Sequence, residues 1–522
     1  MIPQPPADAD AAASVVVHGP GLTPAEVVRV ARGGAPVAIA PAARAAMARS
    51  RERVLAAAAD TRPVYGISTG FGALAATRIP VEQQPALQHA LIRSHAAGMG
   101  PAMPREVVRA MMLLRVRSLA MGLSGTRPAV AELLVACLNA GLTPVVPTHG
   151  SLGCSGDLAP LAHMSLALLG EGWVLDPQGG PTPAGPALRA AGLEPLRLEV
   201  KEGLALINGT DGMLGMLILA LHDADRLLRT ADLTAAMSCE ALLGTDRPFA
   251  AELQAIRPHP GQARSAANLV RLLDGSPILA SHRDSDHLVQ DSYSVRCSPQ
   301  VAGAARDTIA FAVEVAAREL AAAVDNPVVL ESGAVESTGN FHGEPLAFAA
   351  DFCAIALCEV GAIAERRVDR LLDPARSHGL PPFLAVDAGV NSGLMIAQYT
   401  AAALVAENRR LAQPASVDSI PTSGMQEDHV SMGWAAARKL QEVVTNLGRI
   451  LAIELLSATR ALEFREPLAP APATAAAAAR VRAAAGSAGP DRAVAPELAA
   501  VERLVVTGLA LEAAEAHAGP LA

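Results

Sequence analysis

Residues 150–163 read GSLGCSGDLAPLAH and place a serine between Cys154 and Gly156. Glycine carries no Cβ and reaches unusual backbone angles, so its nitrogen can fold back onto a carbonyl two residues earlier. The Gly156 nitrogen could attack the Cys154 carbonyl and close a five-membered ring, and loss of the Ser155 hydroxyl would leave an exocyclic methylene. That product is a strong electrophile made without metal or added cofactor. A small-residue turn is the competing interpretation, and the G-x-S-x-G elbow of serine hydrolases is absent.

Two of the three tyrosines stand in polar or glycine-rich segments rather than in apolar stripes. Tyr65 lies in VYGISTGFG and Tyr293 in VQDSYSVRCSPQ. A tyrosine acts as a general base only where positive charge or hydrogen-bond donors lower its pKa from about 10. Taken singly, either residue could also be a packed tyrosine with one hydrogen bond.

Three further side chains are suited to holding a small polar substrate. Arg296, three residues after Tyr293, could bind a carboxylate with two parallel hydrogen bonds. Asn208 in LINGTDG and Gln290 offer neutral amide contacts. A surface salt bridge for the arginine, and loop or cap roles for the amides, are the alternatives.

Histidines and carboxylates also gather in short motifs. His95 lies in RSHAAG, His429 follows Glu427 in GMQEDHVSMG, and NFHGE contributes His342 and Glu344. None of these motifs matches HExxH or another tight ligand spacing, so the sequence predicts no metal site. A carboxylate and a histidine could equally recognise an imidazole or a phenol.

Several long segments, read together, resemble the aromatic amino acid ammonia-lyases, and among them the histidine-specific branch. They occur in order between about residues 22 and 465, and they are VYGISTGFGALA, GSLGCSGDLAPLAHMSLALLGEG, KEGLALINGTDG, RPHPGQ, VQDSYSVRCSPQ, GNFHGEPLAFA and PASVDSIPTSGMQEDHVSMG. The resemblance implies a mostly α fold, a long helical bundle of the ammonia-lyase type with minor β hairpins. It also implies a homotetramer in which each active site draws on three subunits.

The resemblance implies a self-made electrophile, 4-methylidene-imidazol-5-one (MIO), formed from Cys154, Ser155 and Gly156 with no external cofactor. The first position is more often Ala in this family, but cyclisation uses only its backbone carbonyl, so Cys should be tolerated. Ser68 and Arg117 stand where many members have Asn. These two substitutions concern details of the site rather than the kind of reaction that it catalyses.

Catalytic roles carry over to matching positions of this chain. Tyr65 matches the base that removes a β-proton from the substrate. Asn208 matches the residue that helps hold the amino group beside the electrophile. Tyr293 matches a tyrosine that polarises the electrophile's surroundings, and Arg296 matches the carboxylate clamp.

The remaining matched positions concern the substrate side chain. Gln290 and Phe341 match positions that line the substrate pocket. His95 matches the position that recognises the substrate side chain, and Glu427 matches the acidic residue that assists histidine turnover. Lyases for tyrosine and phenylalanine usually carry His-Leu or Phe-Leu where this chain has Ser94-His95, although related tyrosine aminomutases also place His there. A carboxylate can accept an imidazole N–H, whereas beside a phenyl ring it would be a desolvated charge without a partner.

The expected reaction is therefore the non-oxidative deamination of L-histidine to trans-urocanate and ammonia, the first step of histidine degradation. Three alternatives remain open at this point. They are an MIO-dependent tyrosine or phenylalanine ammonia-lyase or aminomutase, a catalytically silent helical scaffold, and a metal hydrolase.

The composition indicates what kind of protein must position these residues. The 522 residues are 51% hydrophobic but only 2% aromatic, and abundant alanine favours helices. So large an apolar fraction also favours an oligomer. The net charge of −9 argues against a nucleic-acid partner.

The sequence also suggests where the protein works. The N-terminus lacks a signal-peptide pattern, and the apolar residues 346–364 are interrupted by Asp351 and Glu359, as in a buried helix rather than a membrane span. The six cysteines include no CxxC pair. We therefore expect a cytoplasmic, reduced protein without membrane contact.

Periodicity predicts helices over residues 307–325, with Asp307 as N-cap, over 104–122 and over 393–411. A β hairpin is expected to turn at Ser332-Gly333.

The chain is expected to divide into a loose N-terminal segment (1–21), a catalytic unit (22–465) and a C-terminal region (466–522). That last region should consist of an Ala/Pro-rich connection and one helix near residues 498–516.

Overall fold

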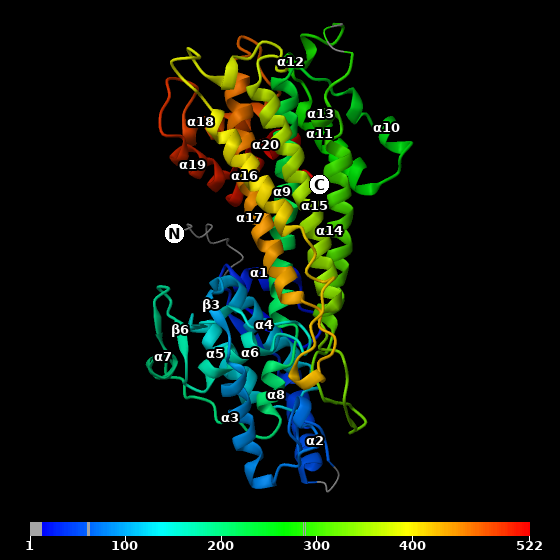
Figure 1. Cartoon of the computed structure of the whole chain (residues 1–522), viewed down its shortest axis with the longest axis vertical. Helices are drawn as coiled ribbons and strands as arrows, with labels where there is room; N and C mark the ends of the chain where they lie inside the picture. Colours follow the sequence, from blue (N-terminus) through cyan, green and yellow to red (C-terminus); the bar gives the residue numbers. More distant parts are fainter. Residues whose placement is uncertain (1–12, 60–62, 286, 288) are drawn as a thin grey trace. The chain divides into compact units, whose positions relative to one another are not determined.

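The computed structural model describes residues 13–59, 63–285, 287 and 289–522 (Figure 1). Mostly helical structure is confirmed, with small sheets. The chain forms two compact units. Unit 1 comprises Met1–Leu219, Val313–Asp351 and Pro414–Arg438, and unit 2 comprises Ala220–Ala312, Phe352–Gln413 and Lys439–Ala522.

Four long helices each contribute residues to both units. They are α9 (Asp211–Ala241), α14 (Ser298–Ala321), α15 (Glu344–Leu372) and α17 (Gly433–Glu463), drawn from green to orange in Figure 1. The predicted start of α14 at Asp307 is wrong, because Pro299 already suits a first helical turn. The Asp307 carboxylate instead accepts a hydrogen bond from the Gly261 N–H at 2.8 Å.

Unit 1 contains the shorter helices of the N-terminal half. These are α1 (Pro24–Ala31), α2 (Pro41–Ala59), α3 (Gln84–His95), α4 (Arg105–Ala120), α5 (Pro128–Asn139), α6 (Leu158–Leu168), α7 (Ala184–Ala190) and α8 (Glu202–Ile207), with 3₁₀ turns η2 (Gly72–Leu74), η3 (Val81–Gln83) and η6 (Ser423–Met425). Helix α4 confirms the prediction for 104–122. It starts directly after Pro104, and the chain leaves it at Gly122, where φ is +70°.

Helix α4 is the centre of the unit 1 core, and it buries three arginines. Arg109 donates to the carbonyls of Val30 and Leu138. Arg117 donates to the carbonyl of Ala322. Burial lowers the pKa of both guanidinium groups, so these cations are held by carbonyl acceptors, as buried charge requires. Arg117 therefore ties α4 to the end of α14.

Unit 2 contains the remaining helices. They are α10 (Ala251–Ala255), α11 (Pro260–Leu273), α12 (Pro277–Ala280), α13 (Tyr293–Arg296), α16 (Met395–Leu411), α18 (Pro472–Ala485), α19 (Val494–Thr507) and α20 (Leu509–Ala518), with 3₁₀ turns η4 (Arg247–Phe249) and η5 (Pro382–Leu384). Helix α16 confirms the prediction for residues 393–411.

The C-terminal prediction is wrong in two respects. Residues 466–495, predicted as a connection, contain α18, because the alanine run after Pro472 buries one face and packs against α20. The single helix predicted near residues 498–516 is two helices, α19 and α20. The break falls at Gly508, whose φ of +80° is left-handed and ends α19.

Within the described residues, the strands form four small sheets. β1 (Val15–Val17) pairs in parallel with β2 (Val37–Ile39), and β3 (Met99–Ala102) pairs with β5 (Pro147–His149). β4 (Thr143–Pro144), β6 (Trp173–Leu175) and β7 (Pro181–Pro183) form a sheet, and β8 (Val328–Val329) pairs with β9 (Val335–Glu336). The β8–β9 pair confirms the predicted hairpin, with Gly333 at φ +92° in its turn.

The predicted loose segment 1–21 is only partly described, because residues 1–12 lie outside the described part of the chain. From residue 13 onward the expectation of a loose segment is wrong. Val15 and Val17 are buried, and β1 is held by its pairing with β2. Val15 and Val17 are buried and Val16 between them is exposed, so one side of strand β1 faces the core.

Two segments, Glu202–Ala241 and Glu344–Leu372, are long and apolar enough to cross a membrane by length and composition alone. Their most apolar windows are 100% and 61% buried inside the protein. Both are core helices, which confirms the prediction for residues 346–364.

An ion pair between α15 and α17 is buried in unit 2. Arg367 Nε and Nη2 lie 2.5 and 3.0 Å from the two carboxylate oxygens of Glu454. The hydroxyls of Thr234 and Ser238, on α9, also donate to Glu454.

We predict that Glu454→Ala destabilises the protein by about 3 to 5 kcal/mol, because it leaves the Arg367 charge buried without its partner. Thermal denaturation checks this. Glu502→Ala is the control, since it removes an exposed pair with Arg449 and should cost at most about 1 kcal/mol. Equal losses of stability in Glu454→Ala and Glu502→Ala would contradict the structural role of the buried ion pair.

Candidate active site

The Cys154-Ser155-Gly156 tripeptide forms a tight bend between β5 and α6. Gly156 has φ +73°, and a side chain at this position would collide with the Gly209 carbonyl. Among the described residues, neither the Gly156 N–H nor the Cys154 carbonyl has a hydrogen-bond partner. The two backbone groups that must join in a cyclisation are therefore free, and only glycine fits the third position.

The segment before the tripeptide is fixed by the loop that leads into α17 and by the start of α15. The Gly153 carbonyl accepts hydrogen bonds from the Ser431 hydroxyl at 2.8 Å and from the Gly343 N–H at 3.0 Å. The Met432 N–H donates to the Leu152 carbonyl at 2.8 Å. Three chain segments far apart in sequence therefore hold the bend in one shape.

Asp157 fixes the other side of the bend. Its Oδ2 accepts from the N–H groups of Gly212 and Met213 in the first turn of α9, at 2.9 and 3.0 Å. Its Oδ1 accepts from the Ser151 hydroxyl at 3.1 Å. Burial raises the pKa of Asp157 to about 7, although the hydrogen bonds to its carboxyl group act in the opposite direction and lower this pKa.

Asn208 lies directly beside the tripeptide, as the sequence predicts. Its Nδ2 donates to the Ser155 carbonyl at 3.0 Å, while its own carbonyl accepts from Arg115 at 3.1 Å. The side-chain Oδ1 of Asn208 is buried and has no partner among the described residues. That orphaned acceptor is available to a donor such as a substrate amino group.

Tyr65 and Glu427 approach each other at Gly72. The Gly72 N–H donates to the Tyr65 hydroxyl oxygen at 3.2 Å. A Cβ placed on Gly72 would lie 3.8 Å from Oε1 of Glu427. The Glu427 Oε2 atom is buried and unpartnered in the described part of the chain.

His95, the last residue of α3, has a polar neighbour in Ser94. Ser94 Oγ donates to the Leu91 carbonyl at 3.1 Å and lies 3.1 Å from His95 Nδ1. A neutral imidazole has one nitrogen that donates and one that accepts, so the His95 ring can take part in either kind of hydrogen bond.

The charge state of His95 is set mainly by burial. Burial lowers its pKa below the ordinary value, although the Leu91 hydrogen bond and the nearby Glu427 charge raise it. The ring is therefore neutral at neutral pH. Burial also raises the pKa of the Cys154 thiol, which leaves that side chain a thiol rather than a nucleophile.

The remaining predicted residues are divided between the units. Phe341 is half-buried in unit 1, two residues before Gly343. Gln290, Tyr293 and Arg296 belong to unit 2, so unit 1 alone does not bring them to the bend. Tyr293 is 74% exposed, and the Arg296 guanidinium stacks over its ring at 4.5 Å.

Sequence reasoning missed two kinds of residue. Asp157 and Ser431 position the bend, and their only signal is that they stand inside the quoted motifs. The second kind is a cluster of His342, Glu344 and His429, whose ligand atoms all lie within 4.8 Å of one another. His342 and Glu344 stand together in NFHGE, but His429 is far from both in the sequence, so no spacing rule joins the three.

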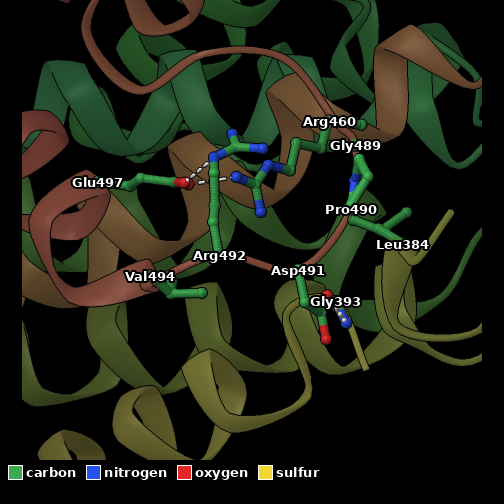
Figure 2. A pocket seen from close by; sticks show the side chains of 10 residues that line it. Leu384, Gly393, Arg460, Gly489, Pro490, Asp491, Arg492, Val494 and Glu497 are labelled. Carbon is green, nitrogen blue, oxygen red and sulfur yellow. Dashed lines mark hydrogen bonds and ion pairs between the residues drawn. The ribbon is translucent and has the colours of Figure 1, made fainter. Parts of the chain in front are cut away.

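A separate pocket in unit 2 contains none of the predicted residues. Arg460, Arg492 and Glu497 line it, and both guanidinium groups reach the Glu497 carboxylate (Figure 2). Its arginines are already engaged, so it is not a candidate for the chemistry.

The family model "Aromatic amino acid lyase" matches residues 22–483. The chain belongs to the aromatic amino acid lyase family. It is 60% identical over 509 residues to a histidine ammonia-lyase of Streptomyces coelicolor, covering 97% of this chain and 99% of that relative.

Solved structures agree with this assignment. A tyrosine aminomutase from Streptomyces globisporus aligns with TM-score 0.92 at 39% identity, over 98% of this chain and 100% of the other. A histidine ammonia-lyase from Trypanosoma cruzi aligns with TM-score 0.90 at 39% identity, over 97% and 96%. Because lyase and mutase share the fold, the site residues must decide the substrate.

Ser68 has a structural role in the turn that carries Tyr65. It is buried, and its hydroxyl accepts from the Val64 N–H at 2.9 Å. The Ser68 N–H donates back to the Val64 carbonyl at 3.0 Å. Ser68 therefore closes the turn that carries Tyr65.

We predict that Ser94→Ala raises the KM for the substrate about fivefold with little change in kcat, since loss of one hydrogen bond of about 1 kcal/mol loosens the His95 ring. Steady-state kinetics checks this. Ser94→Thr, which keeps the hydroxyl, should retain most of the affinity. An unchanged KM in the alanine variant would contradict the positioning role.

Proposed function

We propose that this lyase is a histidine ammonia-lyase that converts L-histidine to trans-urocanate and ammonia without oxidation. The observation that carries the proposal is the pair His95 and Glu427, two polar side chains suited to an imidazole, near a bend shaped for self-cyclisation. A curated relative at 60% identity over nearly the full length supports it. The other members of the site then have roles in the same reaction.

The bend fits the MIO group that its family uses. Gly156 occupies a position that no side chain could, the joining backbone groups are free, and Asn208 holds the Ser155 carbonyl. Once formed from Cys154, Ser155 and Gly156, this group supplies an electrophile that makes the substrate amine a better leaving group. No external cofactor is needed.

The substrate imidazole is recognised by His95 and Glu427. Glu427 presents a buried oxygen without a partner among the described residues, and the neutral His95 ring has one nitrogen that donates and one that accepts. A neutral imidazole likewise has one N–H and one acceptor nitrogen, so it can donate to Glu427 and pair with His95, and an imidazolium can donate to both. A phenyl ring can donate to neither, and it would leave the Glu427 carboxylate desolvated and unpaired.

The proton transfer falls to Tyr65. Its oxygen is in contact with the Gly72 N–H, and Gly72 also borders Glu427. We assign Tyr65 the removal of the β-proton and Asn208 the binding of the amino group through its free Oδ1. Phe341 contributes an apolar wall from unit 1.

Gln290, Tyr293 and Arg296 complete the site in an assembly. We infer a homotetramer in which these residues reach a site formed by another copy, with Arg296 as the carboxylate clamp. The exposure of Tyr293 and the unpartnered buried Nε of Arg296 support this. We also propose that the enzyme works in the cytoplasm on its small-molecule substrate, without nucleic acid or membrane partners.

We predict that purified protein produces urocanate, followed by its ultraviolet absorbance, from L-histidine and not from L-tyrosine or L-phenylalanine. Ser155→Ala should lose nearly all turnover with an unchanged fold, and its intact mass should lack the loss of two water molecules seen in the parent. A cinnamate-type or β-amino acid product from tyrosine or phenylalanine would replace this proposal with the lyase or aminomutase alternative.

We predict that Tyr65→Phe lowers kcat by several orders of magnitude, because it removes the oxygen that accepts the proton, while KM changes little. The measurement is steady-state kinetics with L-histidine. Phe71→Leu is the control, since Phe71 meets the Tyr65 ring edge-on at 6.5 Å without offering a proton acceptor. A loss confined to KM in Tyr65→Phe would rule out the base role.

A further inference from the structure

Three side chains outside the proposed reaction converge in unit 1. His342 lies in the loop before α15, Glu344 is the first residue of α15, and His429 lies in the loop before α17. One ligand atom from each lies within 4.8 Å of the other two. Two imidazoles and one carboxylate are a donor set that transition metals prefer in proteins.

The ligand atoms are somewhat farther apart than in an occupied metal site. His342 Nδ1 and Glu344 Oε2 are 3.9 Å apart, and the rings of His342 and His429 have centroids 5.5 Å apart at a 32° tilt. Bonds of about 2.0 to 2.2 Å in tetrahedral geometry place ligand atoms about 3.3 to 3.6 Å apart. Small side-chain rotations would therefore bring the three ligands into range.

The carboxylate also lacks a better partner. Glu344 Oε2 is buried, and it has no hydrogen-bond partner among the described residues. The nearest imidazole nitrogen of His342, at 3.9 Å, is too far for a hydrogen bond. A buried charged acceptor left unmatched is costly, and a bound cation would remove that cost.

The geometry points to a divalent-metal site formed by His342, Glu344 and His429. The imidazole ligands select a borderline cation such as Zn²⁺, Co²⁺ or Ni²⁺ over Mg²⁺ or Ca²⁺, which prefer all-oxygen sites. Three protein ligands leave at least one coordination position for water or a small-molecule ligand. His429 is exposed, so the cation can enter from solvent.

The site adjoins the bend that carries Ser155. His342 and Glu344 flank Gly343, whose N–H donates to the Gly153 carbonyl. A cation that fixes both flanking side chains therefore also fixes this contact. Metal binding is measured in the absence of L-histidine. A failure to bind metal can therefore be distinguished from a failure of the proposed lyase activity.

The experiment uses the full-length protein, treated with a chelator and then dialysed. Titration with Co²⁺ should give a visible d–d spectrum with about one equivalent bound, and without the thiolate charge-transfer band that a cysteine site would produce. Glu344→Gln and His429→Ala should each weaken binding by about tenfold or more. Circular dichroism confirms that the variants are folded.

His517→Ala is the matched control, because His517 is an exposed histidine on α20. It should bind Co²⁺ as the parent does. The proposal is overturned if the parent binds no stoichiometric Co²⁺, or if folded Glu344→Gln and His429→Ala bind as tightly as the parent. Calorimetry repeats the comparison with Zn²⁺, which has no visible spectrum. The same measurement with Mg²⁺ should show no binding.

Discussion

The buried carboxyl group of Asp157 is the constraint on which the bend at Cys154-Ser155-Gly156 depends. Its oxygen accepts from the first N–H groups of α9, at a helix N-terminus whose backbone donors have no other partner within the helix. The Asp157 N–H in turn donates to the Gly209 carbonyl at 2.7 Å. Gly156 is thereby held against Gly209, and the tripeptide can adopt only a conformation that glycine permits. The proposed cyclisation needs such support, because the closed ring has to be favoured over the extended chain.

In unit 2, a buried polar interaction likewise fixes the backbone near proposed site residues. The pair of Arg367 and Glu454 is buried, and a second nitrogen of Arg367 donates to the Ser294 carbonyl within α13 at 3.2 Å. Helix α13 carries Tyr293 and Arg296, so a structural ion pair fixes the backbone of two proposed site residues. Sites on rigid elements hold their geometry better than sites on unsupported loops. In both units the long helices supply this rigidity.

Specificity depends on few atoms compared with the fold. This lyase shares its fold with a tyrosine aminomutase at TM-score 0.92, so the helices do not distinguish the chemistry. We place the distinction in the side chains proposed to face the substrate ring, and above all in Glu427, because a carboxylate only accepts hydrogen bonds. Under that proposal, exchange of Glu427 for an apolar side chain changes the preferred substrate without changing the scaffold.

The sequence by itself determined the features that depend on neighbours along the chain. These are the Cys154-Ser155-Gly156 tripeptide, helices α4 and α16, and the β8–β9 hairpin, each set by local residues such as Pro104 and Gly333. Pro299 and Gly508 are also local signals, for the start of α14 and for the break between α19 and α20. Only the tertiary structure decided that α18 packs against α20 and that β1 is ordered. It alone brought His342 to His429 and Asp157 to α9. The physical reason is that these features are stabilised by contacts between distant segments, and no local spacing encodes such contacts.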